Sequence, residues 1–216
     1  MERTDVYTAA HKSQRRRLFD LTVAAGCADV DDAASRARLA RAVHALADEL
    51  VAHAHHEDRF IHPTLRRHAP ALADALEDAH GELDARLDQL RDAATRHRCD
   101  ATDDPNRLYR ALASFTSTYL AHLEVEEGQA LPALWRACRD DELGAILTAF
   151  RASRSDAENL TSTLAQLPAL NPREVARMTR AALGEVPLAD VVDLLSTLLD
   201  PGRLGTLLGP TTSASP

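Results

Sequence analysis

The sequence predicts an all-α protein, an up-down four-helix bundle with additional C-terminal helices. Composition is the first reason, because 45% of the 216 residues are apolar but only 4% are aromatic. Alanine, leucine, arginine, aspartate and glutamate dominate, and most of these residues favour helices. Patterning is the second reason, because four segments repeat apolar residues at helical spacings and are joined by short polar connections.

The first two helices are expected over residues 5–25 and from a cap at Asp31 or Asp32 to residue 61. Aspartate side chains accept hydrogen bonds from the free N–H groups at a helix start, so they mark a beginning. Pro63 is expected to bend or close the second helix, because proline cannot donate the next helical hydrogen bond.

The third helix is expected to begin at Pro70, and its leucines recur from Leu72 to Leu90 at spacings of three, four and seven. A fourth helix is expected from a cap around Asp103 to residue 130, with Pro132 beyond it. Short connections place successive helices antiparallel, which describes an up-down bundle. We therefore assign the bundle to residues 1–140.

Residues 141–208 are predicted to form a helical extension. A helix over about 141–166 precedes several prolines and two shorter pieces, 173–183 and 188–199. The last piece is strongly apolar but too short to cross a bilayer. We expect the extension to pack on the bundle or on a partner chain, where it can mediate a homodimer. The polar tail over residues 209–216 is expected to be disordered.

Charge and cysteine usage exclude several classes of protein. The net charge is −8 and both signs are interleaved, which argues against binding nucleic acid. No segment reaches the roughly 20 apolar residues of a membrane span. The three cysteines are far apart, so neither a disulfide framework nor a thiolate metal site is indicated. With no signal-peptide pattern at the N-terminus, we expect a cytoplasmic protein.

An internal repeat carries the chemistry. Two stretches share the pattern His-x3-Glu-x5-Pro-x-Leu, one beginning at His53 and the other at His122. Their glutamates are Glu57 and Glu126. Residues four apart lie on one stripe of a helix, so each imidazole and carboxylate can reach a single metal ion. The second and fourth helices of an up-down bundle are parallel, which lets the two pairs meet across the core.

One such pair is usually a contact on a helix surface. Two pairs on apolar helices are harder to explain without a metal, because buried charges are costly unless they are paired or ligated. The first and third helices add His11 and His80 on their apolar stripes. Each is either a core histidine or a ligand, and the repeat favours the ligand. The predicted metal ligands are His11, His53, Glu57, His80, His122 and Glu126.

This order of residues resembles the hemerythrin-like (HHE cation-binding) domain over about residues 5–140. The resemblance implies two iron ions joined by an oxide or hydroxide, with Glu57 and Glu126 bridging them. Two positions depart from the respiratory hemerythrins. Leu76 stands where they have the upstream histidine of a His-x3-His pair, and Glu126 replaces the aspartate of His-x4-Asp. Both departures are similar to bacterial hemerythrin-like proteins and to the domain of an iron-sensing F-box protein.

The resemblance also implies a function. Four histidines, two bridging glutamates and a bridging oxide fill about ten of the twelve positions around two octahedral ions, unless water or Asp84 fills the gap. Two open positions, one more than a fifth histidine would leave, favour peroxide binding or oxidation chemistry over simple oxygen storage. Because nothing marks a substrate pocket, the first expectation is binding of oxygen, peroxide or nitric oxide, for sensing or sequestration of oxygen, oxidants or iron. An alternative is a di-iron enzyme that uses peroxide or oxygen, and a third reading is an interaction module with a structural metal. No catalytic residue is indicated.

The remaining polar residues near the repeat receive simpler interpretations. Tyr7 and Tyr119 lie one turn before ligand histidines, and core packing is favoured over a bond to a metal ligand. Glu49 and Glu127 are at most outer partners of the ligands. Most of the histidines off the stripe or near helix ends are expected to be solvated; this group is His44, His55, His56, His62, His68 and His97.

Overall fold

The computed structural model describes residues 3–100 and 102–183, and within them every regular element is helical. The predicted all-α class is therefore confirmed. The chain forms two compact units, one ending at Phe150 and the other starting at Arg151. The first unit contains the bundle and all of the predicted metal ligands.

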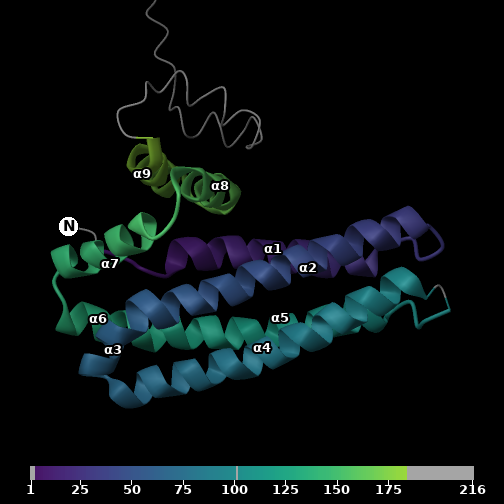
Figure 1. Ribbon diagram of the computed structural model, residues 1–216, viewed down its shortest axis with the longest axis horizontal. Coiled ribbons are helices and arrows are strands. Elements are labelled where there is room, and N and C mark those ends of the chain that lie inside the picture. Colours follow the sequence, from purple (N-terminus) through teal and green to yellow (C-terminus); the bar gives the residue numbers. More distant parts are fainter. Residues whose placement is uncertain (1–2, 101, 184–216) are drawn as a thin grey trace, which may run out of the picture. The chain divides into compact units, whose positions relative to one another are not determined.

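Four long helical stretches lie side by side in the bundle (Figure 1). They are α1 (Thr8–Gly26), α2 (Ala33–His56) with its continuation, α4 (Pro70–Cys99), and α5 (Arg107–Val125) with its continuation. Both α1 and α4 pack against α2 and against α5. The helices thus form a square with α1 and α4 on one diagonal and α2 and α5 on the other. The predicted up-down topology follows, and each diagonal pair is parallel.

Aspartate side chains begin the helices much as expected. Asp32 accepts hydrogen bonds from the backbone N–H groups of Ala34 and Ser35 at the start of α2. Asp104 accepts one from Asn106 just before α5. These bonds satisfy N–H groups that have no partner inside a helix.

The prediction that Pro63 could close the second helix is wrong. After α2 the chain makes a π-helical turn, η1 (Glu57–Ile61), and continues as α3 (His62–His68). The fourth helix does the same through η2 (Glu126–Ala130) and α6 (Leu131–Ala137), which carries it past Pro132. Each π turn ends with an N–H bonded five residues back, to Glu57 and to Glu126. Because the wider turn needs no N–H from the next residue, it accommodates the proline.

The bundle contains two apolar cores separated by a polar layer. The larger core includes Leu18, Leu50, Leu83 and Leu123, and the smaller one lies toward α3 and α6. The smaller core contains Tyr7, Ile61, Leu76 and Ala130. On each long helix the predicted ligands lie between a residue of one core and a residue of the other. The polar layer is therefore enclosed by apolar side chains at both ends.

The C-terminal helices differ in one respect from the prediction. The single helix expected over 141–166 is two helices, α7 (Asp140–Ala152) and α8 (Asp156–Gln166). Ser155 begins α8 with a capping box, in which its side chain and Glu158 satisfy each other's backbone N–H groups. The 3-10 turn η3 (Leu167–Ala169) and α9 (Pro172–Leu183) follow. The predicted helix over 188–199 and the tail over 209–216 lie outside the described residues.

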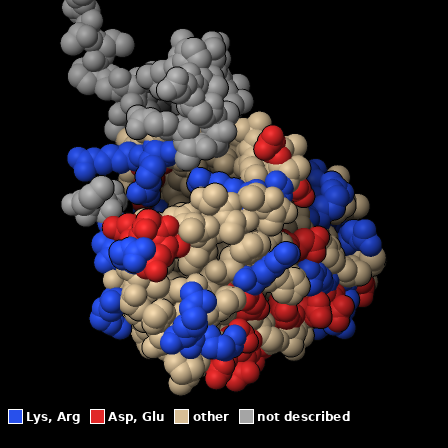
Figure 2. Space-filling model, turned by 60° about the vertical axis from the view of Figure 1, so that its left-hand side comes forward, with Lys and Arg blue, Asp and Glu red and all other residues tan. Residues whose placement is uncertain are grey.

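Charges of both signs are interspersed over the visible face of the space-filling view (Figure 2). Several of them pair along or between helices, as in the ion pairs of Arg66 with Asp74 and Arg91 with Asp48. Among the described residues, no helix is both long enough and apolar enough to cross a membrane.

Candidate metal centre

The polar layer brings all six predicted ligands together. His11 comes from α1, and His80 comes from the middle of α4. His53 and Glu57 come from the junction of α2 and η1, and the matching pair from the junction of α5 and η2. Five of the six residues are buried, and the side chain of His53 is 16% exposed. Two overlapping groups could each hold a metal ion: His11, His53 and Glu57; and Glu57, His80, His122 and Glu126.

The first group lies between α1 and the end of α2. Oε1 of Glu57 is 3.0 Å from Nε2 of His53 and 3.5 Å from Nε2 of His11. The two imidazole rings meet edge to face, with their centroids 5.3 Å apart. Two nitrogens and one oxygen thus converge on one point, as a metal ion requires.

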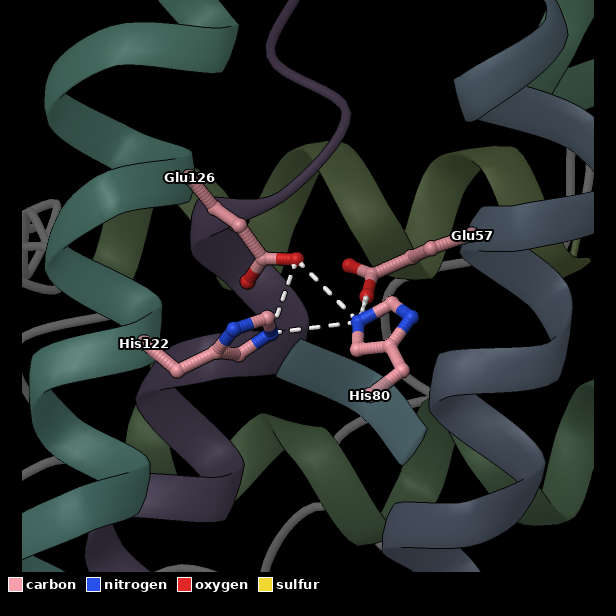
Figure 3. A group of neighbouring side chains, drawn as sticks. All are labelled: Glu57, His80, His122 and Glu126. Carbon is pink, nitrogen blue, oxygen red and sulfur yellow. Dashed lines mark hydrogen bonds and ion pairs between the residues drawn. The ribbon is translucent and has the colours of Figure 1, made fainter. Parts of the chain in front are cut away.

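The second group lies between α4 and the end of α5, and Figure 3 shows its four side chains facing one another. Nε2 of His80 is 3.1 Å from Nε2 of His122. Oε1 of Glu126 lies 3.2 Å from Nε2 of His122 and 3.6 Å from Nε2 of His80. Oε2 of Glu57 completes the group, 3.5 Å from Nε2 of His80.

Each carboxylate divides its two oxygens between the two groups. Glu57 turns Oε1 toward His11 and His53, and Oε2 toward His80. Glu126 turns Oε2 toward His11, at 3.4 Å, and Oε1 toward His80 and His122. A carboxylate placed in this way can bind one ion through each oxygen.

The donor set fits metal ions because several buried atoms lack other partners. Within the described residues, Nε2 of His53, Oε2 of Glu57 and both oxygens of Glu126 have no well-directed hydrogen bond. Buried polar atoms without partners are costly, and a cation among them would remove that cost. Imidazole nitrogens with carboxylate oxygens suit iron, zinc and related transition metals.

Electrostatics in the layer favour charged side chains even without a metal. Burial lowers the pKa of His11, but hydrogen bonds with Glu127 and Glu57 outweigh it and raise the pKa to about 9. Burial also lowers the pKa of His80, but hydrogen bonds with Glu126 and Glu57 outweigh it and raise the pKa to about 10. Burial would raise the pKa of Glu57, but the surrounding histidines lower it well below its usual value. Protons on the histidines therefore neutralise the carboxylates in the metal-free protein, and a metal ion bound at the same nitrogens would have to displace protons.

The acid that follows Glu57 or Glu126 in the sequence accepts a hydrogen bond from the outer nitrogen of a candidate ligand histidine. Asp58 accepts a hydrogen bond from Nδ1 of His80 at 2.8 Å. Glu127 accepts one from Nδ1 of His11 at 2.9 Å. Each acid thereby leaves Nε2 of its histidine turned toward the centre, and such bonds set which nitrogen is available to a metal.

Glu127 contacts a candidate ligand from outside, as the sequence analysis considered. The same contact of Asp58 with His80 was not predicted. The signal for Asp58 was present, because an acid follows the glutamate in both copies of the repeat. Each acid also contacts a second side chain besides its histidine on the neighbouring helix, and this second residue differs between the two halves of the repeat. Arg15 pairs with Glu127, at 2.6 Å, but the corresponding neighbour of Asp58 is His62, with Nδ1 2.9 Å from Oδ1.

The expectation that His62 and His97 are solvated is wrong, since both are buried. His62 is fully enclosed, and its ring stacks on that of His80 at 5.3 Å and 9°. A π turn takes more residues than an α turn, so η1 rotates His62 back toward the core. Burial and the charge of His80 lower the pKa of His62. His97 belongs to the other end of α4, close to its last residue.

The other residues singled out in the sequence take the following positions. Tyr119 is buried and donates its hydroxyl hydrogen bond to Gln14, at 3.1 Å. The hydroxyl of Tyr7 is buried without a hydrogen-bond partner among the described residues, and the ring lies 5.5 Å from that of His11. Leu76 is buried in the smaller core. Asp84 belongs to none of the potential metal groups found in residues 3–100 and 102–183.

A helical bundle with a buried layer of histidines and carboxylates defines the chain as a candidate metal-binding protein. Comparison with family models narrows the class, because residues 3–134 match the hemerythrin HHE cation binding domain. The chain belongs to this family. The comparison with curated proteins found no match, and the comparison with solved structures found none.

Proposed function

We propose that this chain is a non-haem di-iron protein that binds oxygen or a related small oxidant, and that it serves in sensing or sequestration. His11 and His53 would hold one iron ion and His80 and His122 the other, with Glu57 and Glu126 each giving one oxygen to each ion. The observation that carries the proposal is the division of each carboxylate between the two groups of histidines. A single ion would leave half of these oxygens and nitrogens unused.

Two iron ions would supply coordination positions at which oxygen, peroxide or nitric oxide can bind and be reduced or oxidised. The chain's own residues bind and orient the ions, and the two apolar cores exclude water from them. Asp58 and Glu127 keep two of the histidines in the required orientation. Their carboxylates also hold protons that the histidines carry at Nδ1.

A di-iron enzyme that uses peroxide or oxygen is the second candidate function. The supporting observation is Leu76, which is one turn before His80 on α4 and is only 2% exposed. A histidine at that position would fill one more coordination site. With leucine there, about two of twelve octahedral positions stay open, which gives peroxide room to bind and react.

Metal content and spectroscopy test the proposal. Protein expressed with ample iron should contain two iron ions per chain, and Glu126→Gln should lose both, because it weakens a ligand that the ions share. Glu124→Gln is the matched control, since Glu124 lies on the exposed side of the same helix. Full metal content in Glu126→Gln, or no iron in the wild type, would overturn the proposal.

Ultraviolet-visible spectra of the reduced, iron-loaded protein distinguish the two functions. A reversible adduct with oxygen would support binding or sensing. Rapid evolution of oxygen from added peroxide would support the enzyme. A cytoplasmic location and a homodimer through residues 141–208 stay predictions, and size-exclusion chromatography coupled to light scattering tests the dimer.

A further inference from the structure

The outer side of His80 carries a second cluster of potential metal ligands. Asp58, His62 and His80 each offer one ligand atom, and these three atoms lie within 4.8 Å of one another. Oδ1 of Asp58 is 2.8 Å from Nδ1 of His80 and 2.9 Å from Nδ1 of His62. The cluster uses the opposite nitrogen of His80 from the one that faces Glu57 and Glu126.

His62 provides an independent reason to expect a ligand here. Its ring is fully buried, yet neither nitrogen has a well-directed hydrogen bond within the described residues. Its contact with Asp58 is short, but the geometry is not that of a hydrogen bond. A buried imidazole with two unsatisfied nitrogens is costly unless something else binds it.

The two halves of the repeat make a useful internal comparison. In one half, Arg15 places a permanent positive charge on Glu127 through two hydrogen bonds, of 2.6 and 3.0 Å. In the other half, His62 stands beside Asp58 in place of an arginine. A guanidinium excludes a metal cation, whereas an imidazole nitrogen can bind one. Only the Asp58 half can therefore accept a cation on its outer side.

We propose that Asp58, His62 and Nδ1 of His80 form an additional site for a divalent transition-metal ion, on the outer side of the candidate metal centre. The ion would replace the proton shared between Asp58 and His80, which leaves to solvent. Asp58 offers a route, because its side chain is 33% exposed while Glu57 and Glu126 are 3% and 0% exposed. Two nitrogens and one oxygen favour zinc, cobalt or iron over magnesium or calcium.

Zinc binding to the metal-free full-length chain tests the site. Equilibrium dialysis with elemental analysis should find three zinc ions per wild-type chain, the third bound most weakly. His62→Phe should lose only the third, because phenylalanine retains the stacked ring and removes both nitrogens. Calcium in excess should displace none of the three. Asp58 is unsuitable for this test, since it also orients His80.

A matched control excludes general binding to surface histidines. The control variant is His44→Phe, since His44 contacts Thr95 on another part of the bundle. This variant should still bind three zinc ions per chain. Nuclear magnetic resonance of the histidine ring nitrogens gives a second readout that needs no variant. A nitrogen of His62 should shift as the third equivalent of zinc is added, and an unchanged His62 signal would overturn the site.

The outcomes separate this site from the proposed di-iron centre. Two zinc ions in both wild type and His62→Phe would overturn the outer site and leave the central one standing. Three ions in both proteins would also overturn it, because the third would then bind elsewhere. Wild-type protein that binds no zinc at the candidate metal centre would contradict the proposed function. Zinc binding at that centre is detected separately, by shifts of the ring-nitrogen resonances of His11 and His53.

Discussion

Nδ1 of His80 lies 2.8 Å from Oδ1 of Asp58, so the ring turns Nε2 toward the candidate metal centre. Nδ1 of His11 has the same relationship with Glu127. The two acids directly follow Glu57 and Glu126, and each contacts a histidine on a neighbouring helix. The repeat in the sequence thus encodes both a candidate ligand and the support for another.

Removing either support should weaken metal binding without abolishing it. We expect Asp58→Asn and Glu127→Gln each to lower metal affinity by about 10- to 100-fold, because the charged acceptor that orients the histidine is replaced by a neutral amide, which binds the ring N–H more weakly. Competition with a chromophoric chelator measures the change. Asp84→Asn serves as the control on α4, and an equal loss of affinity there would contradict the positioning role.

Metal binding should release protons. In the metal-free protein the pKa values of His11 and His80 are about 9 and about 10, so both rings are protonated at neutral pH. A metal ion can bind only after the proton on the ligating nitrogen leaves. Calorimetry of zinc binding in buffers with different ionisation enthalpies counts the protons. His11→Gln should reduce that count, and an unchanged count would contradict the assignment.

Stability of the metal-free protein should fall as pH rises. In the unfolded chain the imidazoles of His11 and His80 have the ordinary histidine pKa of 6.5, and folding raises it to about 9 and about 10. Protons therefore bind the folded state more tightly than the unfolded state. This contribution is complete below pH 6.5 and is lost as pH rises toward 10. Thermal unfolding across this alkaline range should show a falling Tm, which added metal should reverse.

Leu76→His tests the position that separates this chain from the respiratory hemerythrins. Leu76 is buried in the smaller core, so histidine should destabilise the metal-free protein by about 2–5 kcal/mol through lost packing and a buried polar group. Iron should recover part of that loss, because the new nitrogen can bind the ion held by His80. Urea unfolding with and without metal measures both effects. The same loss in both states would argue against a ligand role for residue 76.

The sequence predicted the bundle and the meeting of the six residues because both depend on regular helical spacing. It could not place His62, because the π turn changes the phase of the helix after Glu57. Pro63 is visible in the sequence, but proline can either end a helix or follow a π turn. The break before α8 was also missed, although Ser155 and Glu158 form a recognisable capping box.

The polar layer between the two apolar cores has a consequence for cooperativity. Leu18 and Leu83 belong to one core and Tyr7 and Leu76 to the other. Between them, the buried residues of α1 and α4 are all polar: His11, Ser13, Gln14 and His80. In the metal-free protein at alkaline pH, His11 and His80 lose the protons that balance Glu57 and Glu126. Repulsion between the two carboxylates would then weaken the junction, so that the smaller core would open while the larger one stays folded. Bound metal would join both cores into a single unfolding unit. Hydrogen exchange at alkaline pH should accordingly show two protection levels in the metal-free protein and one in the loaded protein.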